Sequence, residues 1–540
     1  MPQIAESRST ALRAPRVLAG AAALVGLSVL IGGAFLGMIR EGAADWTGAS
    51  AAFDSYLWRI ARFTLWQAAL STLVSVVPAL ALARALSRHP SFPGRATVLR
   101  LFALPLGLPA IVAALGLLEL YGRAGYLAGP FGWIGGDTWP GIYGLAGILV
   151  AHAFLNIPLA TRLFLEALDT VGTDQWRLAS QLGMGAGPSF RFIEWPVMRA
   201  ALPGIAGLVF MLCITSFTLV LTLGGGPKAT TLEVAIYQSL RFDFDPVRAV
   251  ALTSVQIALT AATLFLLARL GAATVADANL AVSSVRPKAA GAYETLLNGL
   301  LIAAGAAFVA APFLATFASG LQADLSRLAR ESAVLQATIT SLVLALGSAA
   351  LSVALALALV AGRQALEGRR SLLASAMETG AGFVLVVPPI VIGAGWFIML
   401  RRSVDVLTVA PIMVLTVNAA MAMPFAMRAI RPGYDAAAAR HDRLCASLGI
   451  SGWARFRLVD WPVLRRPVLT ATAFAIALSL GDLGVIALFG SEGVQTLPYL
   501  LLSRMGSYRT ADAAGIALLL GLLCLGLMVL ADRLGRETPR

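Results

Sequence analysis

The chain has 540 residues and a formal net charge of +13, yet only 13% of its residues are charged and 58% are hydrophobic. A soluble domain carries about 25% charged residues, so this composition excludes an ordinary soluble protein and predicts an all-α membrane protein. The three cysteines, Cys213, Cys445 and Cys524, fit no metal-ligand spacing or disulfide framework, and we interpret them as packing residues.

Apolar runs long enough to cross a bilayer, about 20 residues each, recur along the whole chain. The first follows three arginines, as in a signal peptide, but it exceeds the roughly 7–15 residues of a signal core, so we expect a retained helix. The predicted spans are 17–39, 63–83, 101–121, 141–161, 203–223 and 249–268, followed by 295–318, 334–361, 381–400, 406–427, 468–489 and 513–531.

Basic residues gather between alternate spans. With the N-terminus inside, most of the 41 lysines and arginines fall in segments predicted to be cytoplasmic, as the positive-inside rule requires. We therefore interpret the positive charge as a sign of topology, exclude nucleic acid as a partner, and expect both termini in the cytoplasm.

Two of these basic segments repeat each other without a gap. RLASQLGMGAGPSFRFIEWPVMR occupies 177–199, and RLCASLGISGWARFRLVDWPVLR stands 266 positions later at 443–465. A repeat at about half the chain length indicates two copies of one module. The sequence predicts a first six-helix module at 1–273, a polar cytoplasmic linker at 274–293 and a second six-helix module at 294–540, with the two modules running in parallel.

Within each copy we expect two short helices that meet at a glycine corner, in the loops 173–200 and 435–467. Gly183 and Gly449 would supply the left-handed residue that ends the first helix, and Pro196 and Pro462 would end the second. Because the same loop occurs in both copies, we expect a partner that docks at two places. The alternative is an amphipathic hairpin that only covers helix ends. The candidate docking residues are Arg177, Leu178, Ala179, Leu182, Gly183, Phe190 and Pro196, and Arg443, Leu444, Leu448, Gly449, Phe456 and Pro462.

These loops resemble the cytoplasmic coupling motif of ATP-binding-cassette (ABC) importer permeases: E-A-A, three residues, Gly, nine residues, then a hydrophobic residue and Pro. The near matches begin at Leu178-Ala179 and Leu444-Cys445, while Arg177 and Arg443 stand at the acidic position. Two further stretches, SFTLVLTLGGGPKATTLEVAIYQSLRFDFDP and LSLGDLGVIALFGSEGVQTLPYLLLSRMGSYRTAD, resemble the fused permeases of bacterial thiamine and thiamine pyrophosphate importers.

The resemblance implies a type I ABC importer permease in the bacterial inner membrane that imports thiamine by alternating access. It implies two copies of a separate ATPase subunit on the cytoplasmic face, which would use ATP and Mg²⁺, and a periplasmic thiamine-binding protein. This chain itself would bind no cofactor and catalyse no reaction. Ferric-iron permeases share the design, so iron or another small solute is the alternative cargo.

The residues themselves agree with an external energy source. GGGPK at 224–228 has proline before its lysine and lacks the Ser or Thr that opens a helix after a phosphate loop, so it is no Walker motif. A proton-coupled secondary transporter is the alternative from another class. The loop RALSRHPSFPGRATVLR at 84–100, where the common signature of such transporters would carry an acid, has none.

Four residues are candidates for the substrate pathway. Asp482 is an ionisable group inside a predicted span, which is costly and marks function by default; its carboxylate would suit a cationic substrate, or it would bind a neighbouring helix. Pro109 and Pro389 interrupt the third span of each half, lining a pathway or simply kinking a helix. Trp396 could stack on an aromatic cation or belong to an interfacial belt.

Two periplasmic segments, 230–244 and 496–509, each pair a short hydrophobic helix with charges, Asp243 and Asp245 in the first and Arg504 and Arg509 in the second. We expect them to help seat the binding protein, with plain interfacial helices as the alternative.

Overall fold

The computed structural model describes residues 2–135, 139–269, 291–366, 372–384, 387–450, 452–490 and 493–535. The first half contains α1 (Pro2–Ala44), α2 (Trp46–Ala51), α3 (Ser55–Arg88), α4 (Arg95–Leu101), α5 (Leu104–Gly107), α6 (Ala110–Tyr121), α7 (Ala128–Gly135), α8 (Leu145–Asp169), α9 (Thr173–Gln181), α10 (Ala186–Ser189), the π-helical turn η1 (Phe190–Glu194), α11 (Trp195–Ile214), α12 (Thr218–Leu223), the 3₁₀ turn η2 (Pro227–Ala229), α13 (Leu232–Arg241) and α14 (Pro246–Arg269).

The second half contains α15 (Ala292–Gln322), α16 (Leu325–Arg330), α17 (Ser332–Ala365), α18 (Leu372–Val384), α19 (Pro389–Leu400), α20 (Val406–Ser447), α21 (Gly452–Arg455), the π-helical turn η3 (Phe456–Asp460), α22 (Trp461–Gly481), α23 (Gly484–Phe489), α24 (Leu497–Gly506) and α25 (Thr510–Gly535). The linker predicted at 274–293 lies outside the described residues as far as position 290.

The membrane-spanning pattern agrees with the sequence prediction. Within the described ranges, ten helices are long and apolar enough to cross a membrane: Pro15–Ala44, Ser55–Arg88, Leu145–Asp169, Ala186–Ile214, Pro246–Arg269, Ala292–Gln322, Ser332–Ala365, Thr408–Asp442, Gly452–Gly481 and Thr510–Leu527. Two shorter apolar helices, α6 and α19, stand at the third predicted span of each half. The all-α membrane fold is therefore confirmed.

The third and fifth spans of each half are broken helices. In the third spans, α6 begins directly after Pro109 and α19 begins at Pro389, because proline has no N–H for the helical ladder and clashes with the preceding turn. The fifth spans, predicted as single helices at 203–223 and 468–489, stop at Ile214 and Gly481 and resume as α12 and α23. Single helices were thus the wrong prediction for the fifth spans.

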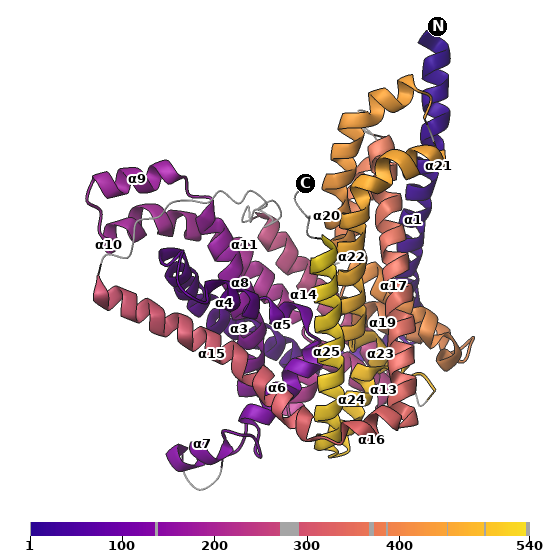
Figure 1. Cartoon of the computed structure of the whole chain (residues 1–540). Helices are drawn as coiled ribbons and strands as arrows, with labels where there is room; N and C mark the ends of the chain where they lie inside the picture. Colours follow the sequence, from indigo (N-terminus) through magenta and orange to yellow (C-terminus); the bar gives the residue numbers. More distant parts are fainter. Residues whose placement is uncertain are drawn as a thin grey trace.

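The first helix of each half packs against the other half. Helix α1 runs along α17 and α19, and α15 runs along α6 and α3. Figure 1 shows the indigo α1 beside α17, far along the sequence, and α15 crossing the purple helices of the first half. Two modules that are separate in sequence are therefore interlocked in space, which periodicity within one segment does not predict.

Glycines let these swapped helices approach backbone to backbone. Gly33 and Gly37 form a small-xxx-small pair on α1, a pattern that favours close helix packing in membranes. A Cβ added to Gly37 would stand 2.5 Å from the carbonyl oxygen of Gly395 on α19. In the other half, a Cβ on Gly116 of α6 would stand 2.6 Å from the Pro312 carbonyl oxygen of α15. Both contacts between a first helix and a third span therefore require glycine.

Replacing Gly37 with alanine is expected to cost about 1–3 kcal/mol, the usual cost of overpacking, because the added methyl meets a backbone atom that no rotamer change can move. The apparent Tm of the detergent-solubilised protein should fall. The matched control is Gly32→Ala on the same helix, where an added Cβ meets nothing within 4 Å. Equal melting temperatures for the two variants would contradict this account of the interface.

Candidate functional site

The first repeated loop folds as a helical hairpin at the end of the molecule where α1 begins and α25 ends (Figure 1). Two backbone hydrogen bonds close the end of helix α9. The Gly183 N–H donates to the Ser180 carbonyl at 3.1 Å, and the Met184 N–H donates to the Ala179 carbonyl at 2.9 Å. This pair of bonds closes a helix around a left-handed residue, and Gly183 has φ of +64°. Gly183 therefore forms the predicted corner.

The second hairpin differs from its prediction because its first helix is not a separate piece. Helix α20 runs unbroken from Val406 to Ser447, out of the predicted span and into the loop. The residues 170–172 that separate α8 from α9 read TVG, whereas the matched positions 436–438 are three alanines. Alanine is the best helix former and glycine is about 1 kcal/mol worse, so only the first copy breaks there.

The corner itself is the same in both copies. Gly449 has φ of +67°, and the Ile450 N–H donates to the Cys445 carbonyl at 2.9 Å, which matches the bond from Met184 in the first copy. The backbone at the two corners is therefore equivalent even though the helices that lead to them differ.

Each hairpin exposes two leucine side chains that lie one helical turn apart. Leu178 and Leu182 are 57% and 68% exposed, and Leu444 and Leu448 are 56% and 63% exposed. Side chains at i and i+4 share one face of a helix. All four lie outside the candidate membrane spans, so lipid chains do not account for them. Exposed apolar pairs of this kind mark contact surfaces.

Pro196 and Pro462 do not end the second short helix, contrary to the prediction. The π-helical turns η1 and η3 lead directly into α11 and α22, closed by bonds from the Trp195 N–H to Phe190 and from the Trp461 N–H to Phe456. A proline ring clashes with the carbonyl four residues before it. The wider π turn moves that carbonyl aside, so the chain continues into the span.

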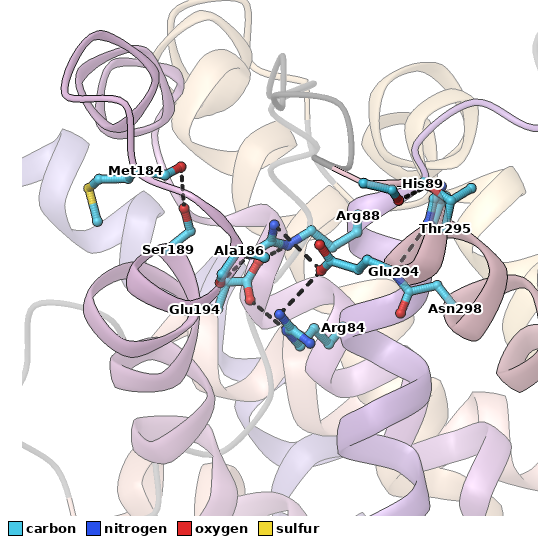
Figure 2. Close-up of polar contacts among 11 residues, drawn as sticks. Arg84, Arg88, His89, Met184, Ala186, Ser189, Glu194, Glu294, Thr295 and Asn298 are labelled. Carbon is cyan, nitrogen blue, oxygen red and sulfur yellow. Dashed lines mark hydrogen bonds and ion pairs between the residues drawn. The ribbon is translucent and has the colours of Figure 1, made fainter.

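A buried acid fastens the first hairpin to the helices beneath it. Glu194 is fully buried, and its two carboxylate oxygens accept hydrogen bonds from Arg88 at 2.6 Å and from Arg84 at 3.0 Å. Arg88 also donates to the Ala186 carbonyl at 3.1 Å. Glu294, at the start of α15, lies 3.5 Å from Arg84 and completes the cluster drawn in Figure 2. The first hairpin is thus tied both to α3 and to the first helix of the other half.

The matched acid of the second copy, Asp460, is also buried but is held more loosely. Its carboxylate lies 3.5 Å from Arg455 and 3.7 Å from Arg16 of α1, and Arg455 also pairs with Asp442. Each hairpin therefore reaches a charged residue on the first helix of the opposite half. The sequence analysis missed these acids, although their matched positions in the two copies were an available signal.

Phe190 and Phe456 are half-buried and support the hairpins from within. Each ring lies 5.9 Å from the ring of the tryptophan five residues later, and the Arg84 guanidinium stands 4.9 Å from the centre of the Phe190 ring. These contacts place both phenylalanines between the hairpin and the span that follows it.

The remaining residues of the predicted docking set take different positions. Ala179 is only 2% exposed and faces the molecule, so it is a packing residue and not part of a docking face. Arg177 is exposed and lies 3.7 Å from Asp174 one turn earlier. Pro196 and Pro462 are exposed. The backbone of Arg443 belongs to α20, but its side chain lies outside what the structure describes.

A second candidate region lies where the broken helices of the two halves meet. Asp482 stands between α22 and α23, where it accepts a hydrogen bond from the Gly484 N–H at 3.1 Å. A Cβ added to the neighbouring Gly481 would lie 3.3 Å from the Cα of Pro109. Two of the predicted pathway residues, Asp482 and Pro109, are therefore brought together across the interface between the halves.

The other two predicted pathway residues belong to α19. Pro389 forms the break at the start of α19. The indole N–H of Trp396 donates to the Leu30 carbonyl of α1 at 2.7 Å, and its ring covers Gly33. Trp396 thus joins the first helix of the chain to α19.

The predicted short periplasmic helices are α13 and α24, and each is anchored in the same way. The first N–H of α13, on Leu232, donates to the Thr64 hydroxyl at 3.0 Å, and that of α24, on Leu497, donates to the Ser341 hydroxyl at 2.8 Å. Arg504 is 8% exposed and pairs with Glu331. Its charge is therefore committed to the fold, contrary to the expectation that it helps seat a partner.

The structure offers no assembled metal site among the residues that it describes, since no group of three or more His, Cys, Asp or Glu side chains could hold an ion there. Cys213, Cys445 and Cys524 are buried and unpaired with one another.

Comparison with known proteins shows which family the chain belongs to. Residues 75–275 and 354–537 match the model described as binding-protein-dependent transport system inner membrane component. The chain is 56% identical over 529 residues to the thiamine transport system permease protein ThiP of Brucella abortus (strain 2308), covering 98% of this chain and 97% of that protein. It is 41% identical over 482 residues to the protein of the same name from Escherichia coli (strain K12), covering 89% and 90%.

A more distant match is the sulfate transport system permease protein CysW of Synechococcus elongatus, 30% identical over 146 residues, which cover 27% of this chain and 50% of that protein. Each of the two segments matched by the family model contains one hairpin. The chain belongs to the family of binding-protein-dependent transport system inner membrane components.

Proposed function

We propose that this chain is the transmembrane subunit of an ATP-driven importer that carries thiamine, free or as its pyrophosphate, into the cytoplasm. The observation that supports the substrate most directly is the match to thiamine permeases over nearly the full length of both chains. The relatives are transport permeases, and the chain is accordingly a membrane subunit without a catalytic site of its own.

The two hairpins are the sites at which ATPase subunits dock. Leu178 and Leu182 fill a groove in one ATPase copy, and Leu444 and Leu448 fill the same groove in a second, identical copy. Gly183 and Gly449 set the corner of each hairpin, and Phe190, Phe456, Pro196 and Pro462 hold its second arm rigid. The exposure of the four leucines on matched faces supports this role. ATP and Mg²⁺ are used by the partner.

Closure of the ATPase pair moves the hairpins, and the hairpins move the helices to which they are fastened as rigid bodies. The central breaks at Pro109, Pro389 and Asp482 then open alternately to the two faces of the membrane. The interlocked first helices support a coupled motion, because neither half can shift without displacing a helix of the other.

The membrane is the bacterial inner membrane, with both termini and both hairpins in the cytoplasm. The distribution of basic residues supports this orientation. On the opposite face, a periplasmic thiamine-binding protein delivers the substrate near α13 and α24.

Uptake of radiolabelled thiamine at nanomolar concentration, in cells with and without this gene, tests the proposal. Uptake that requires the gene and survives a protonophore while ATP is maintained is the expected result, and it also excludes the proton-coupled alternative. Unchanged uptake after loss of the gene would cancel thiamine as the substrate while leaving the family intact. Ferric iron would then be the next cargo to test.

A further inference from the structure

Two acidic side chains, one from each half, carry a buried oxygen that has no hydrogen-bond partner within the described residues. Glu233 on α13 is 2% exposed, and its Oε1 has no partner within the described part of the chain. Asp482 accepts the Gly484 N–H on Oδ1, and its carboxylate lies near Asn418 and the first N–H groups of α23, but its buried Oδ2 likewise has no hydrogen bond. A buried polar atom left without a hydrogen bond destabilises a fold, so each such atom in a native structure calls for an explanation.

Two aromatic residues lie between the elements that carry these two acids. Tyr237 lies one turn after Glu233 on α13, on the same face, and its ring packs edge-on against Phe217 with centroids 5.5 Å apart. Phe217 and the Asp482 Oδ1 flank the same point beside Gly484, at 3.9 Å and 3.7 Å from where a Cβ would stand. Two aromatic rings thus lie between a carboxyl of the first half and a carboxylate of the second.

The repeat itself distinguishes this cluster from the hairpins. A surface that binds two copies of one ATPase must be present twice, and the hairpin leucines are. A single ligand on the pseudo-twofold axis is bound once, so its contacts need not repeat. The position matched to Asp482 is Ser216, and the position matched to Glu233, counted from the anchored residues Leu232 and Leu497, is Pro498. Neither acid has a counterpart in the other half.

We propose that Glu233, Tyr237, Phe217 and Asp482 form a single binding site for an aromatic cation, each half contributing one acid. The carboxylates would neutralise the positive charge, and the two rings would stack on the ligand and attract it through their π faces. In the present closed arrangement the rings contact each other, and the ligand takes the place of that contact when the halves part. The site deepens the proposed function, since thiamine carries a thiazolium cation.

The decisive experiment compares carboxylate with amide in the full importer complex reconstituted in proteoliposomes. Glu233→Gln and Asp482→Asn should each reduce thiamine uptake at least tenfold, whereas Glu233→Asp, which keeps the charge, should retain most of it. The basal ATPase rate and the Tm of every variant are measured beside uptake, and in the control variant both should stay near those of the wild type. Asp324→Asn is the matched control, because Asp324 is an exposed N-cap of α16 and asparagine caps equally well.

A second measurement separates the site from the identity of the cargo. The Tm of the purified complex is recorded with an N-methylthiazolium salt and with neutral thiazole, since a ligand that binds the folded state raises it. The cation alone should stabilise the wild type, and Glu233→Gln should lose that shift. Stabilisation by the cation without thiamine uptake would refute the proposed cargo and keep the site. Equal responses of wild type and both amide variants, in uptake and in Tm, would overturn the site.

Discussion

The double substitution Leu178→Glu with Leu182→Glu is expected to detach one ATPase subunit from the chain. The matched double substitution, Leu444→Glu with Leu448→Glu, is expected to detach the other. Full burial of a leucine contributes about 1.5–3 kcal/mol, and each 1.4 kcal/mol is about a tenfold change in affinity. Losing two leucines and burying two charges should therefore weaken one hairpin's contact at least 100-fold. Variants altered in both hairpins should lose all substrate-stimulated ATPase activity, while one intact hairpin retains part of the attachment. Co-purification of the ATPase with the chain measures the attachment.

The matched control is Ser180→Glu, which adds the same charge to α9 at an exposed position away from the leucine pair. It should leave the ATPase bound, because the apolar face is intact. If the leucine variants of both hairpins still co-purify with the ATPase and respond to substrate, the hairpins are not docking surfaces. The alternative of hairpins that merely cover helix ends would then be correct.

Removal of the Glu194 carboxylate is expected to destabilise the first hairpin by about 3–5 kcal/mol, the usual cost of stranding a buried charge. In Glu194→Ala, Arg88 would be left 8% exposed with the Ala186 carbonyl and a carboxylate 3.9 Å away as its remaining partners. The apparent Tm should fall, and stimulated ATPase activity should fall with it because the hairpin is no longer held against α3. Thermal unfolding and ATPase assays on the same preparation test both effects.

Two further variants test whether the unpaired charge of Arg88 causes the loss of stability in Glu194→Ala. Arg88→Met in the Glu194→Ala background removes the stranded charge and should recover part of the loss, so the double-mutant cycle should be clearly non-additive. Asp460→Ala in the second copy should cost less, because its arginines lie 3.5 and 3.7 Å away. Additive losses, or a larger effect from Asp460, would contradict the view that Glu194 is the tighter fastening.

The hairpin corners were predictable because their chemistry is local. A glycine after a run of helix-forming residues determines where the helix ends, and Gly183 and Gly449 both adopt the conformation expected of them. The contrast between Gly172 and the alanines at 436–438 is equally local, and propensity at these positions predicts a break in the first copy and none in the second. The prediction that Pro196 and Pro462 end the second short helix was wrong because each proline follows a π turn. The rule that proline stops a helix does not take this wider turn into account.

What sequence could not supply is the set of contacts made between distant helices. The packing of α1 on α17 and α19 depends on surfaces hundreds of residues apart, so the hydrogen bond from Trp396 to the Leu30 carbonyl of α1 could not be predicted. Glu233 was overlooked for a related reason. Within α13 it is an ordinary acid in the first turn, and only the helices of both halves packed around it make its carboxyl buried and unpartnered.

The exchange of first helices also has a consequence for how the protein is made. Helix α1 leaves the ribosome first, but α17, against which it packs, begins at Ser332. At about 5–20 residues per second, α1 waits in the bilayer for roughly 15–60 s before its partner is synthesised. During that time its glycine-lined face is open to the insertion machinery and to membrane proteases. A chain that ends before Ser332 would keep α1 without α17 and α19, so such fragments should be degraded rather than accumulate as folded half-permeases.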